Sequence, residues 1–171
     1  MFAKTRDKTY DKRSIYLLLQ PSNTMNALQN IQVILWNKHY ETKALELLKK
    51  YEETSLLLLE NLKSFGPTLT EDTYSGNFKC LIKDERVVAV FALTRVGNLI
   101  VQTDHNENYM DIIINACMQE NLPFHGVVGD WILAKPLWDC ARQKIPTLQE
   151  HAHKKAILYS ANLNGVTQRF G

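Results

Sequence analysis

Three strand-like runs in the middle of the chain constrain its fold more than any other feature. They span residues 77–83, 87–94 and 99–103, and only short connections separate them. Connections of this length predict antiparallel hairpins, so the three runs together predict a β-meander. The middle run is apolar almost throughout, which is typical of a central strand covered on both faces. The sequence therefore predicts an α+β fold with a mixed, mostly antiparallel sheet flanked by helices.

Two helices are predicted before the meander. Apolar residues recur at helical spacing in the first of them: Ala44, Leu45, Leu48 and Tyr51. Thr54 or Ser55 is expected to cap the second, which carries the leucines of residues 56–62. This helix has a clear end, because Gly66 tolerates a positive φ and Pro67 cannot continue the hydrogen-bonded turn.

After the meander the pattern predicts a helix over residues 108–121, a short strand over 124–128 and an amphipathic helical segment with Pro136 in or near its first turn. Residues 156–161 are a candidate for a last strand. One core is expected to contain the following residues: Leu56, Leu59, Leu62, Val88, Val90, Phe91, Leu99, Val101, Ile112, Ile113, Ala116, Val127 and Leu137.

The amino-terminal part of the chain gives weaker signals. Residues 1–22 form a polar and basic extension, apart from an apolar run at 15–19 that suits an edge strand or a packed tail. Between residues 23 and 40 two patterns compete, since the apolar spacing fits a capped helix whereas residues 31–35 alternate like a strand. We expect residues 23–171 to form a single domain, which is an ordinary size for one core.

Charge and cysteine usage narrow the class of protein. The 20 basic and 18 acidic residues nearly cancel, so nothing favours binding to nucleic acid or to an anionic membrane. Cys80, Cys117 and Cys140 are odd in number and widely spaced, which argues against a disulfide framework or a zinc unit. No signal-type or membrane-spanning apolar run is visible, so a cytoplasmic location is expected.

The order of elements, with several local patterns, resembles the GNAT superfamily of acyltransferases, and specifically the amino-terminal half of tandem GNAT proteins. The resemblance spans residues 45–163, and its parts are SLLLLENL at 55–62, GNF at 76–78, VVAVF at 87–91, GNLIVQ at 97–102 and GVVG at 126–129. It implies that the fourth and fifth strands splay apart around the pantetheine arm of acyl-CoA. It also implies transfer of an acyl group from acyl-CoA to an amine.

The chain departs from the superfamily at the loop expected to hold the acyl-CoA pyrophosphate. GNAT enzymes place a Gln/Arg-x-x-Gly-x-Gly/Ala loop there, because bare glycines and a helix amino terminus present free N–H groups to an anion. Here residues 104–108 contain no glycine, and Asp104 and Glu107 are expected to occupy the positive helix end themselves. We therefore expect no cofactor to bind this chain alone, although the superfamily implies acyl-CoA.

The resemblance and the departure together predict a GNAT-related, amino-terminal, non-catalytic lobe of an N-acetyltransferase, whose partner is a second GNAT domain. The alternative is a stand-alone, catalytically inactive GNAT-like module for binding or dimerisation, whose partner is a second copy of the chain. A functional enzyme with an unusual cofactor loop is a third possibility.

Six residues are candidates for a site between the splayed strands. His105, His125 and Asp130 are the catalytic candidates: the two histidines because of their pKa near neutrality, and Asp130 because it follows the fifth strand. The cofactor-binding candidates are Arg95, Gln102 and Trp131. Each has an ordinary alternative, and for Asp130 that alternative is a helix cap.

No metal site is expected. His151 and His153 are separated by one residue, but no third cysteine, histidine or carboxylate stands at a suitable interval except Glu150.

Overall fold

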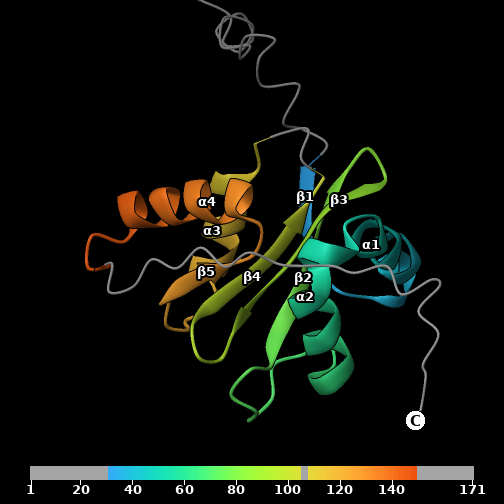
Figure 1. Cartoon of the computed structure of the whole chain (residues 1–171), viewed down its shortest axis with the longest axis horizontal. Helices are drawn as coiled ribbons and strands as arrows, with labels where there is room; N and C mark the ends of the chain where they lie inside the picture. The colour runs from blue at the N-terminus through green and yellow to red at the C-terminus, as the bar shows by residue number, and fades with distance from the viewer. Residues whose placement is uncertain (1–30, 105–107, 150–171) are drawn as a thin grey trace, which may run out of the picture. The chain divides into compact units, whose positions relative to one another are not determined.

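The structure, a computed structural model, describes residues 31–104 and 108–149 (Figure 1). Its elements follow the chain in this order: β1 (Ile31–Leu35), α1 (Lys38–Lys50), α2 (Glu52–Phe65), β2 (Gly76–Lys83), β3 (Arg86–Thr94), β4 (Asn98–Thr103), α3 (Met110–Met118), β5 (Gly126–Val128) and α4 (Trp131–Lys144). The extension at 1–22, the run at 15–19 and the candidate strand at 156–161 lie outside the described residues.

The five strands form one sheet in the order β1-β2-β3-β4-β5. β2 pairs antiparallel with β3 and β3 pairs antiparallel with β4, which confirms the predicted meander. β4 and β5 run parallel, with α3 as the crossover between them. The fold is therefore α+β with a mostly antiparallel sheet, as the sequence predicted.

The turns of the meander explain its register. Asp84 and Glu85 have φ angles of 48° and 61°, the left-handed values that a tight hairpin requires. Gly97 has a φ of 86° between β3 and β4, and a Cβ there would lie 2.8 Å from the Pro123 carbonyl oxygen. Glycine thus brings the start of β4 against the segment that leads into β5, where the Gly97 carbonyl accepts a 2.7 Å hydrogen bond from the His125 amide.

Helices cover both faces of the sheet. α1 and α2 pack against β3 and β4 on one face, and α3 and α4 pack together against β3, β4 and β5 on the other (Figure 1). Every residue of β3 after Arg86 is buried, which confirms its prediction as a central strand. We call the side of the sheet covered by α1 and α2 the α1/α2 face, and the side covered by α3 and α4 the α3/α4 face.

The ends of the first two helices only partly follow the prediction. Asn37 caps α1, and its side-chain oxygen accepts hydrogen bonds from the amides of His39 and Tyr40. The predicted caps of α2 are wrong: α2 begins at Glu52, so Thr54 lies in its first turn, where its backbone N–H donates to the Tyr51 carbonyl. Gly66 ends α2 with a φ of 75°, as predicted.

A continuous apolar cluster fills the α1/α2 face. It consists of Ala44, Leu47, Leu48, Leu58, Phe78, Cys80, Ile82, Val87, Val90, Ala92 and Ile100. The predicted core is wrong at Leu56, which is exposed, whereas Leu58 is buried. A run of four leucines has no helical period of its own, so it does not indicate which of them faces the sheet.

Residues 31–35 form a strand, which decides between the two competing patterns. Trp36 follows β1, donates its backbone N–H to the Phe78 carbonyl at 2.8 Å, and meets the Phe78 ring edge to face. Pro136 lies at the start of the second turn of α4, near the first turn as predicted, and its missing N–H removes one backbone hydrogen bond. In α3, Ile114 is fully buried and Ile112 only partly.

Candidate functional site

The carboxyl ends of β4 and β5 are the first place to examine, because ligands commonly bind where parallel strands end. The last strand pair is Ile100 with Val128, so β5 stops three residues before β4 does. The chain then turns at Gly129, where a Cβ would lie 3.0 Å from the Val101 carbonyl oxygen. The end of β4 therefore projects three residues beyond the end of β5.

A polar cluster surrounds the end of β4. The Tyr51 hydroxyl donates to Asp104 at 3.0 Å, and the Lys50 ammonium lies 3.5 Å from the same carboxylate oxygen. The hydrogen bond with Tyr51, followed by the charge of Asp104, raises the pKa of Lys50. These contacts join the junction of α1 and α2 to the end of β4.

The expected role of Asp104 at the amino end of α3 stays a prediction, because the residues that join Asp104 to α3, 105–107, lie outside the described residues. The Asp104 carboxylate contacts Tyr51 and Lys50, while the side-chain oxygen of Asn108 accepts a hydrogen bond from the Met110 amide at the start of α3. Glu107 and His105 lie outside the described residues.

Gln102 is fully buried in β4 and connects it to α2. Its side-chain oxygen accepts a 2.7 Å hydrogen bond from the Thr54 hydroxyl, and its side-chain nitrogen donates to the Thr103 carbonyl at 2.9 Å. A buried amide with good hydrogen bonds stabilises the packing of a helix on a strand.

Asp130 and Trp131 lie where β5 gives way to α4. Asp130 caps α4, and its carboxylate accepts a 3.1 Å hydrogen bond from the Ile132 amide, which is the ordinary role that the sequence suggested as an alternative. Trp131 keeps about a third of its surface exposed. The structure thus brings three of the six candidates, Gln102, Asp130 and Trp131, to the carboxyl ends of β4 and β5.

Arg95 and His125 lie at the opposite ends of these strands, so their expected position beside the splayed strands is wrong. Arg95 is in the turn before β4 and pairs with Glu71 at 2.8 Å. His125 precedes β5, and its Nδ1 lies 3.0 Å from the Val96 carbonyl oxygen. Because a carbonyl only accepts, Nδ1 is the donor in this contact.

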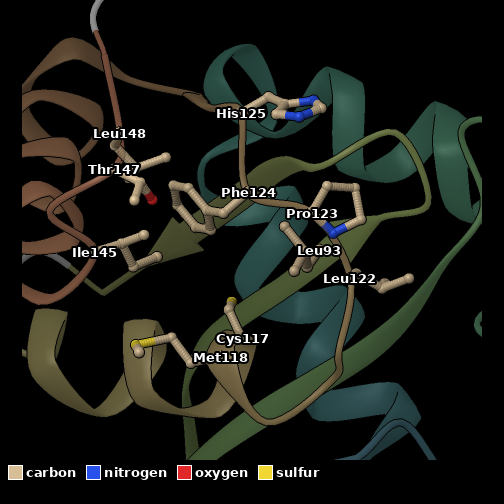
Figure 2. A pocket seen from close by; sticks show the side chains of 10 residues that line it. All are labelled: Leu93, Cys117, Met118, Leu122, Pro123, Phe124, His125, Ile145, Thr147 and Leu148. Carbon is tan, nitrogen blue, oxygen red and sulfur yellow. The ribbon is translucent and has the colours of Figure 1, made fainter.

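A pocket of about 500 Å³ opens at this second end, between the end of α3 and the segment after α4 (Figure 2). Its lining is mostly apolar: Leu93, Cys117, Met118, Leu122, Pro123, Phe124, His125, Ile145, Thr147 and Leu148. The His125 ring is turned away from the side chains of Ile145 and Thr147 (Figure 2). Burial raises the pKa of the Cys117 thiol to about 12, so its reactive thiolate form is scarce at neutral pH.

A second pocket of about 380 Å³ lies between β1 and α3, and sequence reasoning missed it. The charged residue in its lining is Lys79, which is almost fully buried in β2. A signal was present, because Lys79 interrupts an otherwise apolar strand between Phe78 and Cys80. Buried lysines are rare unless they are paired, so such an interruption marks a residue with a specific partner.

Two further findings concern metal binding and membrane crossing by the described residues. Within residues 31–104 and 108–149, no three histidine, cysteine or acidic side chains are grouped closely enough to hold a metal ion. Over the same residues, no helix combines the length and the apolar character needed to cross a membrane.

A scan of the sequence against protein-family models, a search of curated proteins and a search of solved structures each gave no match.

Proposed function

We propose that this chain is a GNAT-related domain that does not itself bind acyl-CoA, and that it serves as the amino-terminal, non-catalytic lobe of an N-acetyltransferase. The observation that supports the proposal best is the arrangement around β4. A meander of β2, β3 and β4 leads through α3 to a parallel β5, and β5 stops three residues before the end of β4. This order of elements is the one on which the sequence resemblance rests, and β5 pairs with β4 over its whole length.

The polar cluster supports the absence of acyl-CoA binding. A pyrophosphate needs open backbone amides and positive potential. The carboxylate of Asp104 instead lies at the end of β4, held by Tyr51 and Lys50, and the chain has no glycine from residue 98 to 125. The Lys50 charge that could attract a phosphate is thus already paired with a carboxylate.

Calorimetric titration with acetyl-CoA tests the proposal. The unaltered chain is expected to show no saturable heat up to about 1 mM ligand, a limit of about 4 kcal/mol of binding free energy. Asp104→Asn is the matched variant, and its gain is expected to be marginal, because side chains in a glycine-free loop still hold the ligand off the backbone. Micromolar binding by the unaltered chain would overturn the proposal and favour an enzyme with an unusual loop.

A loop replacement tests the family relationship itself. Residues 104–109 would be exchanged for Gln-Arg-Arg-Gly-Ile-Ala, which supplies the glycine and the positive charge that the superfamily uses. If β4 and α3 are arranged as in a GNAT protein, the exchanged chain is expected to gain saturable acetyl-CoA binding. A cooperative thermal transition shows that the exchanged chain is folded. A folded variant that still does not bind would count against the relationship.

A further inference from the structure

A charged pair is buried beneath α3, away from the carboxyl end of β4. The Lys79 ammonium in β2 contacts the carboxylate of Glu120, which follows α3, and the two side chains are only 10% and 8% exposed. The side-chain nitrogen of Asn77 also donates to Glu120, at 3.2 Å. Removing two charges from water costs several kcal/mol per ion unless partners compensate, so this arrangement needs an explanation.

The ammonium of Lys79 has more hydrogen-bond donors than it uses. It carries three N–H groups. Among the described residues Glu120 is its one hydrogen-bond acceptor, and the Phe91 ring, whose centroid is 5.8 Å away, provides a cation–π contact. Glu120 already accepts from Asn77 as well as from Lys79. Donor capacity therefore remains on Lys79, at a side chain that lines a pocket.

The pocket beside Lys79 has the composition of a small-molecule site. Its volume of about 380 Å³ falls within the range of about 300–1,000 Å³ that is common for ligand pockets. Val33 and Leu35 from β1 and Ile112 from α3 supply apolar walls. Asn115 on α3 and Gln119, the residue that caps its carboxyl end, lie at helical spacing from Ile112 and add two amide groups.

The charges around the pocket favour a neutral ligand over an anion or a cation. Lys79 and Glu120 cancel each other, so a ligand carboxylate would meet the repulsion of Glu120 together with the attraction of Lys79. A ligand cation would be attracted by Glu120 but would lie nearer the repelling ammonium, because Lys79 lines the pocket and Glu120 is not among its lining residues. A neutral carbonyl accepts from Lys79 without either penalty, and an aliphatic body suits the apolar walls.

We propose that this pocket binds a small aliphatic amide, whose carbonyl oxygen accepts a hydrogen bond from Lys79 and whose aliphatic part packs against Val33, Leu35 and Ile112. The amide N–H groups of such a ligand have possible acceptors in the side-chain oxygens of Asn115 and Gln119. This site uses none of the residues in the polar cluster at the end of β4, so it stands independently of the proposed acyltransferase relationship.

Methyl-labelled NMR of the full chain tests the proposal with three probes of equal length and different charge. Hexanamide is expected to shift the methyl signals of Val33, Leu35 and Ile112 saturably below about 10 mM. Hexanoate is expected to bind at least several-fold more weakly, and hexylamine, which is a cation at neutral pH, is expected not to bind. The absence of saturable shifts with hexanamide, or tighter binding of hexanoate, would overturn the proposal.

Amino-acid substitutions test whether hexanamide binding depends on Lys79. Because Lys79→Met alone leaves a buried carboxylate unpaired, the test variant is the double substitution Lys79→Met with Glu120→Leu, which removes both charges. It is expected to lower hexanamide affinity at least about tenfold, whereas Lys63→Met, at a lysine on α2 that is 81% exposed, leaves the affinity unchanged. A folded double variant that binds as tightly as the unaltered chain would refute the proposal.

A direct readout covers the case in which the double variant does not fold. In the unaltered chain, the Nζ resonance of Lys79 is expected to shift with hexanamide at the same concentrations as the methyl signals. Methyl shifts without a change at Lys79 Nζ would mean an apolar contact alone, and would exclude the hydrogen bond on which the proposal depends.

Discussion

The two faces of the sheet differ in what their interiors contain. On the α1/α2 face, Ala44, Leu48 and Leu58 from the helices pack against Phe78 and Val90 in one continuous apolar cluster. The α3/α4 face also has fully buried apolar residues, but it includes the Lys79–Glu120 pair and both described pockets. Alternate residues of the same strands, such as Val90 and Phe91, face these two environments.

This difference means that the α1/α2 face mainly stabilises the fold, whereas the α3/α4 face has room for a ligand. A close-packed apolar layer contributes the most free energy of unfolding, because each buried methylene adds about 0.8 kcal/mol. A layer with pockets and a charged pair contributes less per residue, yet it offers volume and hydrogen-bond donors to a ligand. The variants that follow test this division, beginning with the largest expected effect.

Val90→Asp is expected to unfold the domain. Val90 is fully buried at the centre of the α1/α2 cluster, and an unpaired carboxylate there costs several kcal/mol against a typical total stability of about 5–15 kcal/mol. Circular dichroism should show no cooperative thermal transition. Leu57→Asp is the control, because Leu57 is 56% exposed on α2 and its variant is expected to fold. A native-like melt of Val90→Asp would show that this face is not the stabilising layer.

Lys79→Met is expected to lower the free energy of unfolding by about 3–5 kcal/mol, since it leaves Glu120 buried with Asn77 as its described partner. Adding Glu120→Leu is expected to restore most of that loss, because replacing both charges by apolar groups is often neutral. Urea denaturation of the two single variants and the double variant measures the coupling. Additive losses would mean that the pair is solvated and that the two faces are less different than described.

Leu58→Ala is expected to cost about 2–5 kcal/mol and Leu56→Ala less than about 0.5 kcal/mol. Leu58 is 2% exposed against the α1/α2 cluster, whereas Leu56 is 48% exposed on the same helix. Urea midpoints of the two variants check the orientation of α2. Equal losses would contradict the described rotation of this helix.

The rates at which two buried cysteines are chemically modified compare how readily the two faces of the sheet open. Burial raises the pKa of Cys80 and of Cys117 to about 12, so their thiolate fractions are similar and low at neutral pH. Cys80 belongs to the α1/α2 cluster, whereas Cys117 lines a pocket of the α3/α4 face. Methyl methanethiosulfonate is therefore expected to modify Cys117 faster, by about tenfold, which corresponds to about 1.4 kcal/mol in opening free energy.

Mass spectrometry of peptides after timed quenching measures both rates in one sample. Cys140, which is partly exposed, serves as the fast internal reference. Equal rates at Cys80 and Cys117 would mean that both faces open together.

The sequence by itself determined the meander, the helices on either side of it and the end of α2. Each depends on local physical properties: a tight turn fixes antiparallel pairing, an unbroken apolar run requires cover on both faces, and Gly66 supplies a positive φ. Of the six site candidates, Gln102, Asp130 and Trp131 lie at or just after the carboxyl ends of β4 and β5, as expected from the order of the elements.

Only the tertiary structure decided which leucine of α2 is buried, where the Asp104 carboxylate points and what accompanies Lys79. The partners of these side chains are distant in the chain: Asp104 is 53 residues from Tyr51, and Lys79 is 41 residues from Glu120. A pattern of residues indicates which face an element buries, but not which side chain it meets there. Such contacts depend on the rotation of each helix over the sheet, which the packing of the whole core fixes.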